Sequence, residues 1–197
     1  FNQALDNLPE NLHTLSINDC HKFNQPLDKL PQNLKILKIR SQNLNRSLDN
    51  LPKNLEKLEI DISNSYAPLT FNHLPESLKS LKIISHQFDY PIYNLPKTLE
   101  SLFMVCVNFN KKLDNLPSSL QSLTLYGNKF NKSLDNLPPL LQSFDFACFG
   151  FTHSLNNLPD NLQSLKIDIN GYSQPINNLP KKLKHLTIQS NIFNSSI

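Results

Sequence analysis

Large apolar and polar side chains alternate in short stretches that recur along the whole chain. The segment SLTL at 122–125 is typical, because its apolar residues stand at every second position. Alternation with a period of two indicates a strand that buries one face. Nine stretches share this pattern, and they begin at residues 14, 36, 57, 80, 101, 122, 143, 164 and 185. The sequence therefore predicts nine short strands.

A Leu-Pro pair precedes each predicted strand. The leucines of these pairs are Leu8, Leu30, Leu51, Leu74, Leu95, Leu116, Leu137, Leu158 and Leu179. Their successive differences are 22, 21, 23 and then 21 throughout. Proline removes a backbone donor and moves the preceding residue out of the α region. The connecting segments are therefore predicted to be extended, or to hold one short 3-10 turn, with little or no α-helix.

The repeat unit reads F-N-x-x-L-D-N-L-P-x-x-L-x-x-L-x-[I/L], followed by four or five variable residues. Ordering the backbone of one unit costs about 1–2 kcal/mol per residue. Its roughly six large apolar side chains return only about 1.5–3 kcal/mol each, so one unit cannot fold alone. Stacked units share their apolar faces. We expect residues 1–197 to form one domain of nine repeats, with FNSSI at 193–197 starting a tenth.

Two parts of this pattern carry a family resemblance. Residues 120–130, LQSLTLYGNKF, resemble the core of the leucine-rich repeat, with Asn128 in its asparagine position. The full unit, with its F-N start and L-P pair, resembles the FNIP repeat, a leucine-rich-repeat relative of social amoebae and giant DNA viruses. The resemblance covers essentially all 197 residues. It implies a right-handed solenoid that carries a parallel sheet on its concave face and binds proteins there.

The same resemblance implies one further role. Some family members carry an F-box upstream of the repeats, which would make the repeats the substrate-recognition part of a ubiquitin ligase adaptor. No F-box occurs within these 197 residues, so this role is an alternative that depends on analogy alone. A structural scaffold that associates with copies of itself is the second alternative to a protein-interaction module.

The side chains that alternate with the buried ones should point outward and form columns across the sheet. In the middle of this face the columns carry apolar and aromatic residues with charged residues around them. The predicted partner-binding residues are Ile84, Phe103, Val105, Tyr126, Lys82, Asp145, Lys166 and Asp168. An apolar cluster with a charged rim is typical of protein interfaces, and aromatic residues are frequent hot spots. The alternative is that Phe103 and Tyr126 only pack across neighbouring strands.

Other outward columns favour structural roles. Lys38 and Arg40 stand beside Glu59 and Asp61 on the next strand, which favours cross-strand ion pairs over steering of a ligand. Five serines form one column: Ser80, Ser101, Ser122, Ser143 and Ser164. This column is explained better by a ladder of hydroxyl groups, or by inheritance from one duplicated unit, than by a small polar surface that a partner protein approaches.

An asparagine precedes most of the Leu-Pro pairs. This column comprises Asn7, Asn50, Asn94, Asn115, Asn136, Asn157 and Asn178. We predict that its side chains form a ladder that satisfies backbone groups of the turns, the alternative being a local preference for turns. The irregular segment YAPLTFNHLP at 66–75 is predicted to bulge on the convex side, with a recognition loop as the alternative.

The chain lacks the clustered residues that catalysis needs. Its six histidines do not stand at metal-ligand spacing, and no phosphate-binding glycine motif occurs. Cys20, Cys106 and Cys148 form no C-x-x-C pair. Cys106 and Cys148 occupy equivalent positions two repeats apart, so their backbones should be about 10 Å apart, which is too far for a disulfide. Gly127, like the other two glycines, follows a predicted strand where a turn needs freedom. We expect no enzyme activity, cofactor or metal.

Composition bears on the kind of partner and on the cellular compartment. The net charge is +3, and basic residues are interleaved with acidic ones, so nucleic acid is a disfavoured partner. No apolar run is long enough to span a membrane. An odd number of cysteines without a C-x-x-C pair favours a reducing compartment. We therefore expect a cytoplasmic protein, in the host cytoplasm if it is viral, with the nucleus left open.

Overall fold

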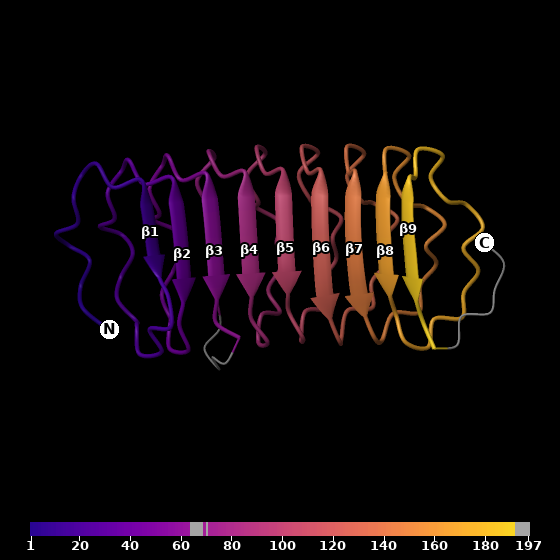
Figure 1. Cartoon of the computed structure of the whole chain (residues 1–197), viewed down its shortest axis with the longest axis horizontal. Helices are drawn as coiled ribbons and strands as arrows, with labels where there is room; N and C mark the ends of the chain where they lie inside the picture. Colours follow the sequence, from indigo (N-terminus) through magenta and orange to yellow (C-terminus); the bar gives the residue numbers. More distant parts are fainter. Residues whose placement is uncertain (64–68, 70, 192–197) are drawn as a thin grey trace.

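Nine parallel strands form a single sheet in sequence order. The computed structural model describes residues 1–63, 69 and 71–191. Its strands are β1 (Thr14–Ile17), β2 (Ile36–Arg40), β3 (Lys57–Asp61), β4 (Ser80–Ile84), β5 (Ser101–Val105), β6 (Ser122–Gly127), β7 (Ser143–Cys148), β8 (Ser164–Asp168) and β9 (His185–Gln189). Each strand from β2 to β8 pairs with the one before it and the one after it, and β1 and β9 pair with one neighbour each (Figure 1). All nine strands begin at the predicted residues, and the prediction of a leucine-rich-repeat-like solenoid is confirmed.

The register of the sheet keeps equivalent residues of successive repeats side by side. Leu37 pairs with Leu58, for example, and Lys38 with Glu59. Within each strand from β2 to β8 half-buried and buried residues alternate. Consequently the outward residues form straight columns across the sheet, as the repeat pattern predicts.

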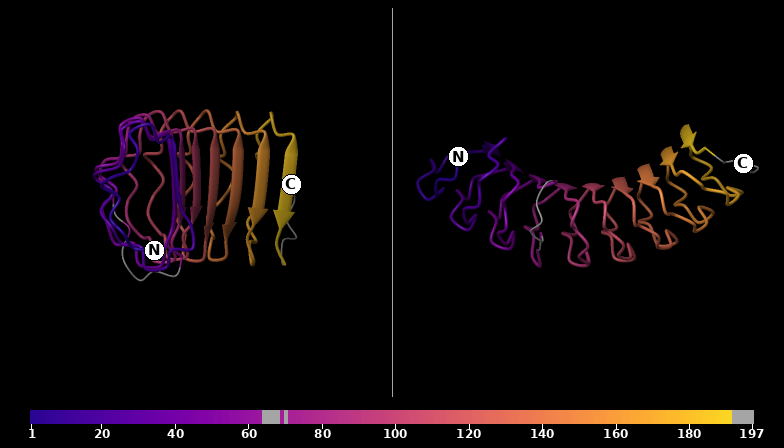
Figure 2. Two further views of the ribbon diagram at one scale, coloured as in Figure 1. Left: turned by 60° about the vertical axis from the view of Figure 1, so that its left-hand side comes forward. Right: turned by 90° about the horizontal axis from the view of Figure 1, so that it is seen from below.

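The strands line the inner side of an arc, and the connecting segments form its outer side (Figure 2). The described residues contain no helix. After each Leu-Pro pair the chain makes one tight turn, as where the Leu99 amide donates to the Pro96 carbonyl at 3.0 Å. This bond spans three residues, the spacing of a 3-10 helix. The sheet is thus the concave surface, and short turns rather than helices return the chain.

The core is a stack of identical layers. The inward leucine and isoleucine side chains of β2 to β8 are almost wholly buried. Behind them the phenylalanines that open the repeats stack on one another. The ring centroids of Phe88 and Phe109 lie 5.9 Å apart, and those of Phe109 and Phe130 lie 6.0 Å apart. Each coil is therefore stabilised mainly by its two neighbours.

The predicted asparagine ladder before the Leu-Pro pairs is wrong. All seven side chains of that column are exposed. Within the described residues only two of them make a side-chain hydrogen bond, and each donates to an aspartate rather than to turn backbone: Asn136 to Asp114, and Asn157 to Asp135. The turn directs these side chains toward solvent, away from the backbone of the neighbouring coil.

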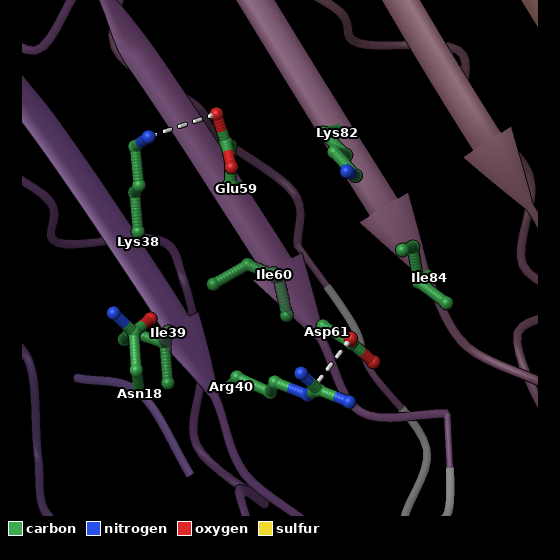
Figure 3. A pocket seen from close by; sticks show the side chains of 9 residues that line it. All are labelled: Asn18, Lys38, Ile39, Arg40, Glu59, Ile60, Asp61, Lys82 and Ile84. Atoms are coloured by element: carbon green, nitrogen blue, oxygen red, sulfur yellow. Dashed lines mark ion pairs between the residues drawn. The ribbon is translucent and has the colours of Figure 1, made fainter. Parts of the chain in front are cut away.

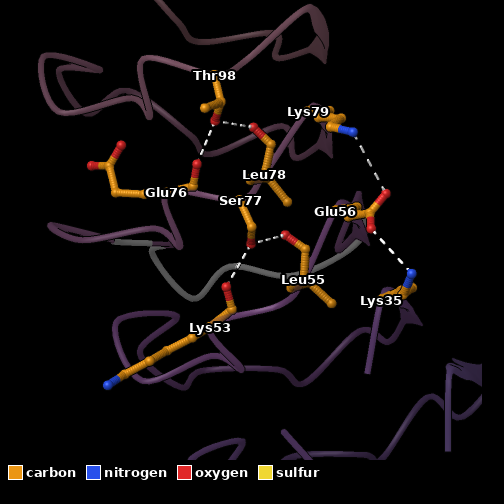
Figure 4. Close-up of polar contacts among 9 residues, drawn as sticks. All are labelled: Lys35, Lys53, Leu55, Glu56, Glu76, Ser77, Leu78, Lys79 and Thr98. Carbon is orange, nitrogen blue, oxygen red and sulfur yellow. Dashed lines mark hydrogen bonds and ion pairs between the residues drawn. The ribbon is translucent and has the colours of Figure 1, made fainter. Parts of the chain in front are cut away.

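Two other columns satisfy the backbone instead. The asparagines that follow Phe1, Phe23, Phe109 and Phe130 accept from the next coil, as where Asn110 Oδ1 accepts from the Asn131 amide at 3.0 Å. Two residues after the proline, most repeats have an Asn, Ser or Thr that donates to carbonyls of the preceding coil: Asn33, Asn54, Ser77, Thr98, Ser119 and Asn161. Ser77 Oγ, for example, donates to the carbonyl oxygens of Lys53 and Leu55, both at 2.7 Å (Figure 4). These bonds join the connecting segments of successive coils.

Two predictions fall wholly or partly outside the described residues. The bulge expected at 66–75 includes residues 66–68 and 70, and the tenth repeat is expected at 193–197. Both stay predictions, as does the division of the whole chain into nine complete repeats.

Candidate partner-binding surface

The structure brings four of the predicted residues together in the middle of the concave face. Ile84 ends β4, Phe103 and Val105 belong to β5, and Tyr126 belongs to β6. The register places Val105 between Ile84 and Tyr126 in one row. All four side chains are half-buried. We call these four residues the central cluster.

The two aromatic rings of the central cluster touch. The ring centroids of Phe103 and Tyr126 lie 6.1 Å apart in an edge-to-face arrangement. Lys82 on β4 places its Nζ 4.9 Å from the centroid of the Phe103 ring. The alternative interpretation, packing across neighbouring strands, thus describes a real contact. The contact fixes the two rings relative to each other, and because they are only half-buried, part of each ring stays accessible.

Tyr126 is also fixed at its hydroxyl. Its Oη donates to Asp145 Oδ2 at 2.6 Å, and Lys166 Nζ lies 3.5 Å from the same oxygen. Burial, followed by the hydrogen bond and charge of Asp145, raises the pKa of Tyr126 above its ordinary value. The phenol therefore stays protonated and keeps donating. The three residues form a network that β6, β7 and β8 supply in turn.

A pocket of about 290 Å³ lies beside the central cluster, at the carboxyl edge of the strands. We call it the edge pocket. Its lining residues are Val105, Val107, Tyr126, Gly127, Asn128, Ala147, Phe149, Lys166 and Asp168. Phe149 leaves 51% of its surface exposed. Sequence reasoning missed Val107 and Phe149 because both stand after a strand. Extending the period-two alternation by one further step would have found them.

The N-terminal part of the concave face is charged rather than apolar. Lys38 Nζ lies 3.6 Å from Glu59 Oε1, and Arg40 Nε lies 3.4 Å from Asp61 Oδ2 (Figure 3). Burial alone would raise the pKa of Glu59, but the hydrogen bond and charge of Lys57 and the charges of Lys38 and Lys82 lower it. The predicted cross-strand pairing is thus present. These charges largely neutralise one another around a shallow pocket of about 190 Å³.

The described residues contain no group of three side chains that could hold a metal ion. Cys106 and Cys148 are free and buried, and burial raises the pKa of both thiols to about 12. A thiol in that state is a poor nucleophile. The serine column lies half-buried along the first positions of β4 to β8. No helix within the described residues is long and apolar enough to cross a membrane.

Comparison with known structures agrees with this architecture. CroV588, titled a novel circular LRR protein structure, superposes with a TM-score of 0.77 and 31% sequence identity. That match covers 92% of this chain but 27% of CroV588, so the chain spans about a quarter of that protein. YopM from Yersinia enterocolitica WA-314 superposes with a TM-score of 0.54 and 22% identity over 98% of this chain and 50% of YopM, which shows the fold alone. The protein is a solenoid of the leucine-rich-repeat type.

The repeats themselves have a more particular assignment. The family model described as FNIP Repeat matches residues 23–61 and 67–106, so these segments are FNIP repeats. The resemblance seen in the sequence is therefore confirmed for them. No curated protein matches the chain.

Proposed function

We propose that the chain is a protein-interaction module whose concave face binds a partner protein at the central cluster. One observation carries this proposal: two aromatic rings in mutual contact stand half-buried on a face that no other part of the described chain covers. Leucine-rich-repeat-like folds generally act as scaffolds for protein interaction. In this proposal the protein performs no chemistry, and it presents a rigid surface.

The surroundings of the cluster are suited to such a role. Lys82 lies on the N-terminal side of the cluster, and Lys166 and Asp168 lie on the C-terminal side. Because Phe103 and Tyr126 are already positioned by each other and by Asp145, a partner would lose little free energy in ordering them. Their apolar area would supply affinity, and the charged rim would supply orientation.

The test is affinity capture with the wild-type chain and with a Phe103→Ala, Tyr126→Ala double variant. We expect the wild type to retain a partner that the double variant loses. A Tyr93→Ala variant is the matched control, because Tyr93 is a 58% exposed aromatic residue outside the sheet. All three proteins should first show similar thermal stability. Equal capture by the wild type and the double variant would refute binding at the central cluster.

A second candidate function is self-association into a larger curved array. The observation that favours it is the similarity to CroV588, which is described as circular, together with the arc of the sheet (Figure 2). Light scattering over a range of protein concentrations tests it. A mass that rises with concentration would support assembly, and a constant monomer mass would refute it.

We propose two finer assignments. The substrate-recognition role in an F-box-type ubiquitin ligase adaptor rests on the family resemblance, and copurification of a longer native polypeptide with cullin-type ligase components would test it. A cytoplasmic location fits the three free cysteines, which a reducing compartment would keep unpaired. Microscopy of the tagged native protein would test that location.

A further inference from the structure

The edge pocket has a chemical character that the central cluster lacks. Its floor is small and apolar, because Ala147 lies between Tyr126 on β6 and Asp168 on β8 in one row of the sheet. Neighbouring strands are about 4.8 Å apart, so the backbones of Tyr126 and Asp168 are separated by about 10 Å. A methyl group at Ala147 leaves most of that gap empty. The exposed ring of Phe149 borders the gap at the carboxyl edge.

Of the charged residues around this gap, Lys166 is paired with Asp145, and Asp168 is not part of an ion pair among the described residues. Lys166 lies 3.5 Å from Asp145 Oδ2, and Asp145, first among its neighbours, raises the pKa of Lys166 and keeps the amine charged. The two charges largely cancel. Asp168 has no ion pair within residues 1–63, 69 and 71–191. The pocket therefore has one carboxylate left over, and a cation is the group that complements it.

The residues that line the edge pocket favour arginine over lysine as the cationic side chain. The arginine guanidinium stacks on aromatic rings and pairs with a carboxylate through two parallel hydrogen bonds. Its aliphatic stem packs on apolar surface, which Ala147 provides. Lysine offers only a strongly hydrated point charge. A volume of about 290 Å³ is at the lower limit for drug-sized ligands and is suited to one long side chain.

We propose that the edge pocket receives an arginine side chain of the partner, with its guanidinium paired to Asp168 and stacked against Phe149. The neighbouring residues of the same partner segment then cover the central cluster. This inference deepens the proposed function and rests on it, because the edge pocket adjoins the central cluster through Val105 and Tyr126.

The test is selection from a displayed library of random linear peptides against the wild-type chain. We expect the enriched peptides to share an arginine with an apolar residue nearby. A synthetic copy of one such peptide is then titrated against variants. Asp168→Asn should weaken its binding by about tenfold or more, since the negative charge and one of the two parallel hydrogen bonds to the guanidinium are lost. Replacing the peptide arginine by alanine should weaken binding to the wild type, and should weaken it clearly less with Asp168→Asn, where only the contacts to Phe149 and Ala147 remain to be lost.

Control variants separate this inference from the proposed function. Asp160→Asn removes an equal charge at an exposed position outside the sheet and should leave the affinity unchanged. Phe103→Ala removes a residue of the central cluster that does not itself line the edge pocket, and it should also weaken binding.

The possible outcomes are distinct. Peptides that need Phe103 but show no preference for arginine, or that tolerate Asp168→Asn, would overturn the inference and leave the proposed function standing. Enrichment of acidic residues would also overturn it, because Lys166 would then be the recognising group. Arginine peptides that need Asp168 but not Phe103 would support the inference and count against the central cluster. No enrichment at all would overturn both.

Discussion

At Gly127 the backbone of β6 passes so close to the preceding coil that no side chain fits. A Cβ built at this position would lie 2.6 Å from the carbonyl oxygen of Cys106. The residue belongs to the strand, so its need for glycine is steric and does not come from a flexible turn. Gly127→Ala should lower the free energy of unfolding by about 1–3 kcal/mol, measured by chemical denaturation.

Gly150 supplies the control for this substitution. A Cβ there would lie 3.1 Å from the Asn128 carbonyl oxygen, a tight contact that a small shift relieves. Gly150→Ala should therefore cost clearly less than Gly127→Ala. Equal losses in the two variants would show that backbone freedom, and not the close approach, selects glycine at both positions.

The cysteines also differ residue by residue. Burial raises the pKa of Cys106 and Cys148 to about 12, so both remain thiols in mildly alkaline solution. The half-buried Cys20 is open to reagent. Brief treatment of the native protein with iodoacetamide should label Cys20 alone, and unfolded protein should be labelled at all three, as peptide mass spectrometry would show. Native labelling of Cys106 would contradict the packing described for β5.

At the scale of the repeat element, Leu140 departs from the ladder that joins the coils. Two residues after the proline, Ser119 Oγ donates to the Leu99 carbonyl at 2.7 Å, and Asn161 Nδ2 donates to the Pro139 carbonyl at 2.8 Å. Leu140 occupies the equivalent place between them and is 52% exposed. Leu140→Asn should donate to the carbonyl of Ser118 and raise the free energy of unfolding by about 0.5–1.5 kcal/mol.

Leu140→Ala is the comparison that isolates this hydrogen bond. It removes the exposed leucine without adding a donor, so its stability should stay near that of the wild type. Thermal melts of the three proteins measure the difference. If Asn and Ala at this position gave the same melting temperature, the ladder would contribute nothing at this coil.

The elements show why some features were predictable from the sequence and others were not. All nine strands began where expected, because a strict repeat aligns the alternation in every copy. The ladder was placed in the wrong column because the Asn2 column holds slightly fewer asparagines than the Asn7 column. Which of the two columns faces the neighbouring coil depends on the backbone geometry of the turns. The amino-acid sequence of the turns does not specify that geometry. The edge pocket was missed because Phe149 points outward only after β7 has ended.

For the whole molecule, the arrangement is one-dimensional. Within the described residues each strand contacts only its immediate neighbours in the sheet. The stacked rings of Phe88, Phe109, Phe130 and Phe151 continue the same nearest-neighbour pattern through the core. In such a molecule the free energy of unfolding is approximately the sum of the intrinsic stabilities of the coils and the energies of the interfaces between neighbouring coils. A defect should therefore have different consequences in the middle of the array and near one end.

Phe109→Ala and Phe23→Ala test this property, since both rings are fully buried. Each change should cost about 3–5 kcal/mol locally. Phe109 stacks on rings in both directions, so its loss weakens the two interfaces that join the halves of the array. We expect its denaturant unfolding to broaden, with a smaller dependence on denaturant, because the halves unfold separately. Phe23→Ala should leave most coils in one cooperative unit with a nearly unchanged slope. If both variants only shifted the midpoint at constant slope, the array would be a single cooperative unit, and coupling across many coils would have to replace the nearest-neighbour account.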